Sequence, residues 1–364
     1  MRRSRIAVWF LSMVLLVGGT YCVTAFTECP ILSEMRNIWI ETAMTTGDHQ
    51  WLATSLFPDF VVQNVMAKQI NTVEGIAGLD ESSPVEPIAP VEPEIIPEIE
   101  TEMIEATPLL PADILGQRDL VEGGKDLQGN KVVINDIDQG ILVSEVKAVS
   151  YTGKIVQIDD PSRVFVGVTD QKNSRGKLIC DYLEDENAII GMNASGFLDY
   201  EGKGLGGEII GQTVSKGEFW GDYIEKMYTM GFTEDDRLIA GDIPDWRQYQ
   251  LRDAIQSNPV IIKDGKSLMN GSSGWGLQPR TVIGQRADGV VLFLVIDGRK
   301  PGYSVGATMA DCADILLSYG AETAAACDGG SSAVLAYEDH IINRPSTPMV
   351  TGRYLPNAFL VRKK

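Results

Sequence analysis

Histidine and cysteine are too scarce in this sequence to build the common metal sites. The only two histidines are His49 and His340, and no two of the five cysteines have the CxxC spacing. Two histidines cannot supply a multi-histidine zinc site or an HExxH helix. Five cysteines in 364 residues also cannot form a disulfide framework. These shortages exclude zinc proteases, zinc deaminases and small disulfide-rich folds.

Basic residues are also in short supply. The chain has 31 lysines and arginines against 50 aspartates and glutamates, a formal net charge of −19. A surface this acidic repels phosphate backbones, so we expect no nucleic-acid partner. The length is sufficient for one large domain or two smaller ones.

The N-terminus contains a long run without charge. Arg2, Arg3 and Arg5 precede 21 uncharged, mostly apolar residues at 6–26. As a helix, such a run is long enough to cross about 30 Å of hydrocarbon, and the basic flank is expected to stay in the cytoplasm. We therefore predict a single-pass transmembrane signal-anchor within residues 1–30, which makes the membrane a partner and places the C-terminal domain outside the cell. A cleaved signal peptide is the alternative.

The composition changes abruptly after a mixed juxtamembrane segment at residues 31–80. Residues 81–113 contain seven prolines, eight glutamates and one aspartate, but no lysine or arginine. Such a segment has no face that can pack, and proline and like charges favour an extended chain. We predict a disordered linker at 81–113, followed by one folded domain at 114–364.

Short strand-like runs alternate with glycine turns in this C-terminal part, and helical patterns are few. One helical pattern begins at Thr308, which with Asp311 has the spacing of a capping box. Many short strands with one or two helices predict an α+β fold, a mixed β-sheet domain with few helices.

A hairpin is predicted between residues 281–284 and 290–296. The segment between these runs contains Asp288-Gly289, a common hairpin turn. If those two residues form the whole loop, Arg280 lies opposite Asp297, close enough for an ion pair.

A second aspartate is expected at the same place. The strand at 290–296 is followed by a helix at 309–319 and a strand at 322–327, which ends at Asp328. If the two strands are parallel, Asp297 and Asp328 leave the sheet at one edge, where ligands often bind. Neighbouring glycines allow close approach of a ligand to the backbone. Two alternatives are a Ca²⁺ or Mg²⁺ ion between the carboxylates and purely structural roles.

Five motifs then occur in order along the chain. They are Asn193-Ala194-Ser195-Gly196-Phe197, Arg280-Thr281-Val282-Ile283-Gly284, Asp297-Gly298-Arg299, Ser304-Val305-Gly306-Ala307-Thr308 and Asp328-Gly329-Gly330-Ser331-Ser332. With these motifs, residues 149–361 resemble the phosphodiester glycosidase family, which includes N-acetylglucosamine-1-phosphodiester alpha-N-acetylglucosaminidase. The anchor and linker resemble those of bacterial relatives described as exopolysaccharide-biosynthesis proteins.

The resemblance implies an extracytoplasmic hydrolase that cleaves sugar-1-phosphodiester bonds in cell-surface or exopolysaccharide glycans, with no required cofactor. It implies catalytic roles for Asp297, Asp328 and Arg280. The substrate-binding residues that it implies are Asn193, Gly196, Gly298, Ser304, Thr308, Gly329, Gly330 and Ser331. Two other functions stay open: a membrane-anchored glycan-binding or scaffold protein, and a transferase in exopolysaccharide assembly.

Overall fold

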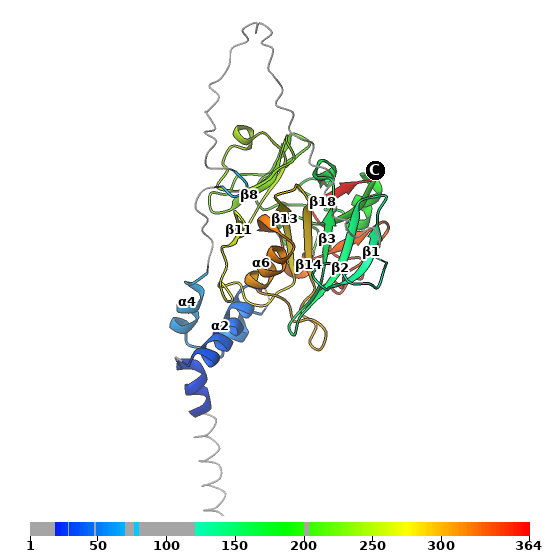
Figure 1. The fold of residues 1–364 in the computed structure, drawn as a ribbon. Helices are drawn as coiled ribbons and strands as arrows, with labels where there is room; N and C mark the ends of the chain where they lie inside the picture. The colour runs from blue at the N-terminus through cyan, green and yellow to red at the C-terminus, as the bar shows by residue number, and fades with distance from the viewer. Residues whose placement is uncertain (1–18, 28, 47–48, 70–75, 80–120, 200–203) are drawn as a thin grey trace, which may run out of the picture. The chain divides into compact units, whose positions relative to one another are not determined.

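The structure is a computed structural model that describes residues 19–27, 29–46, 49–69, 76–79, 121–199 and 204–364 (Figure 1). The chain forms two compact units. The helical unit comprises residues 1–70 and 271–277, and the β unit comprises residues 71–270 and 278–364. The predicted linker at 81–113 and residues 1–18 of the predicted anchor lie outside the described residues, and both stay predictions.

The helical unit contains α2 (Pro30–Met44), α3 (Trp51–Thr54) and α4 (Asp59–Met66). Pro30 occupies the first turn of α2, where a missing N–H costs nothing. The loop at 271–277 belongs to this unit, because Leu277 donates its N–H to Thr42 Oγ1 at 2.9 Å. In the described part of the chain, no helix has the length and apolar character needed to cross a membrane.

The β unit contains three sheets of mostly antiparallel strands. The large sheet runs β1 (Lys131–Asp136), β2 (Ile141–Lys147), β3 (Thr152–Ile158), β14 (Val291–Ile296), β13 (Arg280–Arg286), β15 (Ala321–Ala326), β11 (Val260–Lys263) and β12 (Lys266–Ser267). A second runs β17 (His340–Ile341), β16 (Leu335–Tyr337), β5 (Ala188–Asn193), β18 (Asn357–Arg362) and β4 (Val164–Val168). The third runs β7 (Glu218–Trp220), β6 (Thr213–Ser215), β10 (Leu251–Ser257), β8 (Tyr228–Thr233) and β9 (Leu238–Gly241).

Few helices accompany these sheets. Among the described residues of this unit they are α5 (Ile179–Asp185), α6 (Met309–Ser318) and the short 3₁₀ turns Pro161–Arg163, Trp246–Tyr249 and Gly330–Ser332. Figure 1 shows α6 lying across the large sheet, and a Cβ on Gly284 of β13 would lie 3.7 Å from Leu316 of α6. The predicted mixed β-sheet domain with few helices is thus confirmed.

One core joins all three sheets. Phe232 of β8, Phe293 of β14 and Phe359 of β18 come from different sheets, and all three are fully buried in the same cluster. The rings of Phe293 and Phe359 lie 6.4 Å apart. The three sheets therefore form a single packed body.

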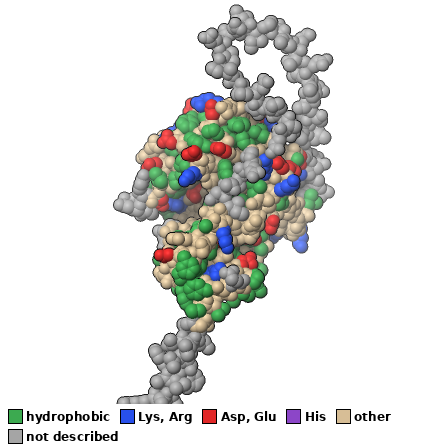
Figure 2. Space-filling view, turned by 90° about the vertical axis from the view of Figure 1, so that its left-hand side faces the viewer, with side chains coloured by type: hydrophobic (Ala, Val, Ile, Leu, Met, Phe, Trp, Pro, Cys, Tyr) green, Lys and Arg blue, Asp and Glu red, His purple; other side chains and the backbone are tan. Residues whose placement is uncertain are grey.

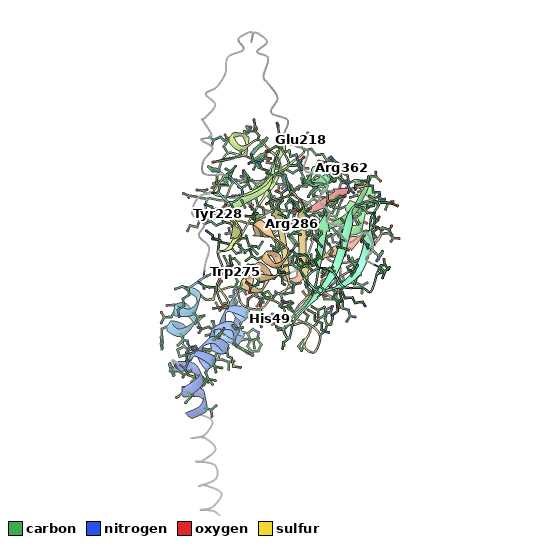
Figure 3. The ribbon with its side chains drawn as sticks, in the orientation of Figure 1. His49, Glu218, Tyr228, Trp275, Arg286 and Arg362 are labelled. Atoms are coloured by element: carbon green, nitrogen blue, oxygen red, sulfur yellow. The ribbon has the colours of Figure 1, made fainter. Side chains whose placement is uncertain are left out.

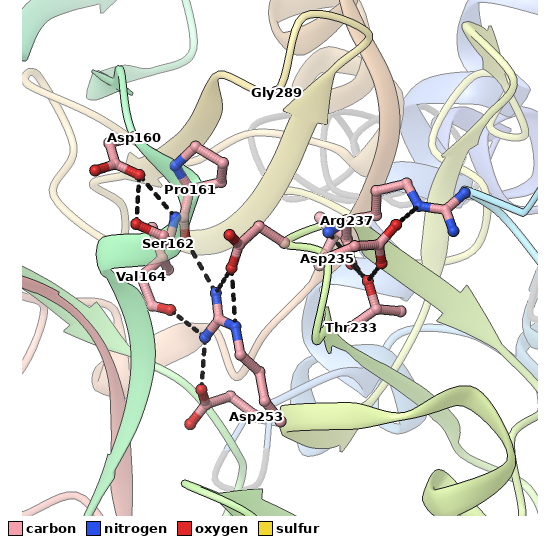
Figure 4. A network of polar contacts seen from close by, with 12 residues as sticks. Asp160, Pro161, Ser162, Val164, Thr233, Asp235, Arg237, Asp253 and Gly289 are labelled. Carbon is pink, nitrogen blue, oxygen red and sulfur yellow. Dashed lines mark hydrogen bonds and ion pairs between the residues drawn. The ribbon is translucent and has the colours of Figure 1, made fainter. Parts of the chain in front are cut away.

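Arg252 of β10 also ties two sheets together. Figure 4 shows the polar contacts around its labelled partners Pro161, Val164 and Asp253. Its Nη1 donates to the carbonyl of Val164 in β4 at 2.7 Å and pairs with Asp253 at 2.6 Å. Its Nη2 donates to the carbonyl of Pro161 and to Asp236. One guanidinium thus satisfies two carbonyls at the start of β4 from a strand of another sheet.

The β13–β14 hairpin differs from its prediction by one residue. Its loop is Ala287-Asp288-Gly289, closed by a hydrogen bond from Arg286 N to Val290 O, with Gly289 at a φ of +90°. Three-residue loops with a left-handed glycine are a common hairpin type. Arg286, labelled in Figure 3, pairs with Asp288 beside this turn.

The extra loop residue changes the register at the other end of the hairpin. Arg280 pairs with Ile296, so the predicted pairing of Arg280 with Asp297 is wrong. Because side chains alternate along a strand, a one-residue slip puts Arg280 and Asp297 on opposite faces of the sheet.

The predicted crossover is confirmed. Strand β13 is antiparallel to both β14 and β15, so β14 and β15 are parallel to each other with β13 between them. Helix α6 connects them and starts with the predicted capping box of Thr308 and Asp311. Asp297 and Asp328 therefore leave the large sheet at the same edge.

Candidate active site at Asp328

Asp328 lies where the large sheet meets the loop after β5. Its N–H donates to the carbonyl of Ala194 at 2.8 Å, and the preceding Cys327 donates to the carbonyl of Thr281 at 2.9 Å. A Cβ on Gly196 would lie 3.9 Å from the Asp328 carboxyl carbon. The loops that carry Gly196 and Asp328 are therefore in contact.

The surroundings of Asp328 disfavour its charged form. Burial raises the pKa of this carboxyl from 3.8 to about 6, although the residue as a whole keeps some exposed surface. A hydrogen bond with the Ser332 side chain and the charges of Arg353 and Arg299 lower the pKa but do not outweigh burial. A carboxyl that titrates close to neutral pH suits acid–base chemistry.

Arg299 is one of the two cations that act on Asp328. Its Nε and Nη2 donate to Gln278 Oε1 at 3.1 and 2.9 Å, and its Nη1 donates to Ser331 Oγ at 3.4 Å. A Cβ on Gly330 would lie 3.0 Å from the same guanidinium. The cation thus extends over the Gly330-Ser331 turn, and the side chain stays exposed.

Arg353 is the other cation. It forms an ion pair with Asp199 and lies over the ring of Phe197, with its guanidinium carbon 4.6 Å from the ring centroid. Its place is therefore fixed by the loop that follows Gly196. The charges of these two guanidinium groups act on the Asp328 carboxyl, and planar cations of this kind are suited to an anionic ligand.

Glycines at 298 and 329 let the two aspartate loops pack closely on Pro279. A Cβ on Gly298 would lie 2.7 Å from Pro279 N, and a Cβ on Gly329 would lie 2.7 Å from Pro279 O. Gly330 N donates to the same carbonyl at 2.9 Å. The predicted glycines therefore bring the loops together through backbone contact.

Asn193 is fully buried behind Asp328. Its Nδ2 donates to Asp328 O at 2.6 Å, and its Oδ1 accepts from Thr281 Oγ1 at 2.7 Å and from Val334 N at 3.1 Å. These bonds hold the Asp328 loop against β5 and β13. The structure places Asn193 as a positioning residue, and its sugar contact stays a prediction.

Ser304 and Thr308 also bind protein groups. Ser304 Oγ donates to Asp297 O at 2.5 Å and accepts from Thr152 N at 3.0 Å. Thr308 Oγ1 accepts from Asp311 N at 3.0 Å and caps α6. Both hydroxyls hold the chain between Asp297 and α6, and their substrate contacts stay predictions.

Asp297 has a different environment from Asp328. It is only 2% exposed, and its carboxylate accepts from Tyr303 Oη at 2.7 Å, Asn343 Nδ2 at 2.9 Å and Arg344 N at 2.8 Å. Burial raises the pKa of Asp297 more than these hydrogen bonds lower it. The two aspartates share a sheet edge, but the Asp297 carboxylate is enclosed by three donors from two segments of chain, one at Tyr303 and one at Asn343-Arg344.

Arg280 lies on the α6 side of the sheet. It is buried, and its Nε donates to the carbonyl of Ala307 at 3.0 Å. Burial lowers its pKa to about 10, Cys312 and Asp311 of α6 raise it, and Arg299 lowers it. The charges that act on the Asp328 carboxyl are those of Arg299 and Arg353, and the catalytic role of Arg280 stays a prediction.

No group of three or more His, Cys, Asp or Glu side chains within the described residues is arranged to hold a metal ion. The Ca²⁺ or Mg²⁺ alternative at Asp297 and Asp328 thus finds no third ligand of these types there.

Comparison with known proteins identifies the domain. Residues 186–362 match the family described as phosphodiester glycosidase. This matched stretch, just under half of the 364 residues, is similar to that family. The resemblance drawn from the five motifs is thereby confirmed.

Two relatives illustrate the extent of the similarity. The SPbeta prophage-derived uncharacterized protein YomE of Bacillus subtilis (strain 168) is 27% identical over 202 residues, which is 51% of this chain and 29% of that protein. The chain thus spans under a third of the length of that relative. The catalytic domain of zebrafish N-acetylglucosamine-1-phosphodiester alpha-N-acetylglucosaminidase, auto-inhibited by its pro-peptide, has a TM-score of 0.51 and 16% identity. The match covers 67% of this chain and 87% of that chain, and shows a shared fold.

Proposed function

We propose that the β unit hydrolyses sugar-1-phosphodiesters at the glycosidic carbon–oxygen bond, with Asp328 as the reacting carboxylate. The observation that carries this proposal is the Asp328 carboxyl, which lies against the Gly196 loop and whose pKa burial raises to about 6 despite the charges of two arginines. A family of phosphodiester glycosidases supplies the substrate class.

Asp328 acts on water in this proposal. At neutral pH the carboxyl is mostly ionised, so it accepts a proton from a water molecule that attacks the anomeric carbon. The bond between that carbon and the phosphate oxygen breaks, and its electron pair leaves with the phosphate. The products are the free sugar and a phosphomonoester, and the proton on Asp328 passes to solvent.

The two arginines stabilise the leaving group. A phosphomonoester leaves with one more negative charge than the phosphodiester carried, so cations placed at its oxygens lower the barrier. Arg299 and Arg353 supply planar donor groups that match phosphate oxygens. Asp297 keeps the Gly298–Ser304 loop in place through Tyr303 and Ser304 Oγ.

The test is sugar release by the purified full chain from a synthetic glycosyl phosphodiester. Sugar and phosphomonoester should appear in equal amounts, and Asp328→Asn should lower kcat by about two orders of magnitude. Arg299→Lys should raise KM, because lysine lacks the planar donor pair. Arg286→Lys is the matched control, since Arg286 pairs with Asp288 at the distant hairpin turn.

Three outcomes separate the alternatives. Unchanged turnover in Asp328→Asn would reject the mechanism. Binding of glycan without product would indicate the scaffold function, and transfer of sugar to an acceptor glycan would indicate the transferase.

We also propose that the chain is anchored in the cell membrane with the β unit outside and acts on cell-surface or exopolysaccharide glycans. Three arginines before the uncharged run at 6–26 support this orientation. Protease added to spheroplasts should remove the β unit, and full protection of that unit would reject the orientation.

A further inference from the structure

The helical unit exposes an unusual number of large apolar side chains, and Figure 2 shows hydrophobic side chains gathered on it. The exposed fractions are 71% for Ile31, 64% for Met35, 50% for Trp39, 60% for Trp51 and 56% for Phe60. We call these five residues the apolar surface. Large exposed apolar side chains concentrated in one small unit commonly mark an interaction site.

Helix α2 is apolar on two sides. Ile40 and Ala43 are buried in a cluster with Val61 and Val65 of α4. Its exposed residues Ile31, Met35 and Trp39 recur every four positions, so they lie along one side of the helix. The inner side forms the core of the unit, and that core leaves the outer stripe uncovered.

The apolar surface is connected to the end of the uncharged run at 6–26. Residues 19–26 are helical, and the ring of Phe26 stacks on Phe60 with centroids 6.1 Å apart. Arg36 Nη1 donates to the carbonyls of Ala25 and Thr27 at 3.0 and 3.2 Å. The chain that leaves the run is thus fixed to the helices that carry the surface.

A hydrogen bond from Trp39 also links α2 to α3, the helix that carries Trp51. Trp39 Nε1 donates to the carbonyl of Leu52 at 3.4 Å, which brings the middle of α2 to α3. Tryptophan is favoured at membrane–water interfaces because its ring is apolar and its N–H can stay hydrogen-bonded.

We propose that the apolar surface lies in the interface of a lipid bilayer, beside the point where residues 6–26 enter it. This inference rests on the proposed membrane anchoring and is independent of the proposed hydrolysis. A membrane that holds residues 6–26 would meet this unit first, because Phe26 is part of it. Insertion of apolar rings would then add to the anchor.

Charge contributes little to this contact. The described helical segments carry Glu34, Glu41 and Asp59 against Arg36 and Lys68. Such a mixture offers no basic patch for anionic headgroups. Binding should therefore be the same on zwitterionic and anionic lipid.

The test is quenching of tryptophan fluorescence by lipids that are brominated near the headgroup. The full chain is reconstituted into phosphatidylcholine vesicles with Trp9→Phe in every variant, so that the 6–26 run gives no tryptophan signal. Replacing both Trp39 and Trp51 by Phe should lower the quenched signal about threefold, because interfacial rings are the ones such lipids reach. Trp246→Phe is the control, since Trp246 belongs to the β unit.

Adding phosphatidylglycerol should leave the quenching unchanged. Equal quenching with and without Trp39 and Trp51, in protein that floats with the vesicles, would overturn the inference while leaving the anchor intact. Protein that fails to float would reject both. Loss of lipid quenching together with a dimer that Met35→Glu dissociates would show that a second copy covers the surface, and this too would overturn it.

Discussion

Asp328 occupies a site that disfavours its own charge. Its pKa is about 6 in the folded chain, against 3.8 for an ordinary aspartate. Between these values the folded state holds the proton more tightly than the unfolded state, so stability falls as pH rises from about 4 to 6. Such a cost is typical of residues kept for function.

Asp328→Asn should therefore stabilise the protein while it removes activity. At pH 7 we expect the free energy of unfolding to rise by about 1–3 kcal/mol, because the disfavoured charge is gone. The gain should vanish near pH 3, where Asp328 is mostly protonated in both states. Urea denaturation at the two pH values measures this, and a loss of stability at pH 7 would indicate a structural role.

The same pKa predicts how activity depends on pH. If ionised Asp328 accepts a proton from water, kcat/KM should fall tenfold per pH unit once pH drops below about 6. Sugar release measured from pH 4 to pH 8 checks this. A rise in activity over the same acid range would show that Asp328 acts as an acid instead.

Replacing Asp297 should lower the stability of the protein, whereas replacing Asp328 should raise it. Asp297→Ala leaves the donors of Tyr303, Asn343 and Arg344 without their acceptor, which should cost about 2–4 kcal/mol. Thermal unfolding measures the loss. Asp339→Ala is the control, because that side chain is 96% exposed and should change stability little. Equal melting temperatures for the two variants would contradict the anchoring role.

At the scale of single residues, the sequence predicted Asp328 as a site residue. It did not predict that Arg299 and Arg353 act on its carboxyl. Asp328 follows a predicted strand and sits in a glycine-rich motif, so pattern and chemistry agree there. Arg299 stands inside a motif, yet only the φ of +58° and the contact with Ser331 reveal its direction. Arg353 reaches the site from a loop far along the chain, and no local pattern signals that.

At the scale of elements, the sequence predicts connections better than registers. The β14–α6–β15 crossover follows from chain direction and handedness, which few alternatives satisfy. The β13–β14 register depends on whether the loop has two or three residues, and Asp288-Gly289 suits both. Because the loop has three residues, Arg280 pairs with Ile296 and its side chain lies on the face of the sheet that α6 covers.

The start of α6 offers a test of an element. Thr308→Ala should lower the free energy of unfolding by about 1 kcal/mol, because the cap to Asp311 N is lost. Thr308→Ser keeps the hydroxyl and should retain most of the stability. KM should stay unchanged in both variants if Thr308 is only a cap, and a raised KM in Thr308→Ala alone would restore its predicted substrate contact.

At the scale of the whole molecule, the sequence does not predict how the strands are divided among the three sheets. The sequence indicates many short strands, but the three sheets depend on pairings such as β3 with β14, which are distant in sequence. Hydrophobic alternation shows that a strand has a buried face without showing which sheet it faces. For the same reason, the sequence does not show that residues 76–79, which precede the predicted linker, pair with a strand of the β unit.

Residues 76–79 join the β unit from the far side of the predicted linker. Ala77 exchanges two backbone hydrogen bonds with Ala240 of β9 and is fully buried in the main core. Ile76 and Leu79 pack on a neighbouring cluster that contains Ile239. A fragment that begins at residue 114, the predicted domain boundary, therefore lacks part of this sheet.

We expect fragment 114–364 to melt about 5–10 °C below fragment 76–364. The missing segment supplies two hydrogen bonds and partial burial of two apolar side chains, together about 2–3 kcal/mol, and each kcal/mol shifts the melting temperature of a domain of this size by about 2–4 °C. Ala77→Pro in fragment 76–364 separates pairing from chain length, because proline cannot donate to Ala240 O. Its melting temperature should approach that of fragment 114–364. If the three proteins melt together, residues 76–79 contribute nothing to the β unit, and the predicted boundary at residue 114 is adequate for an isolated domain.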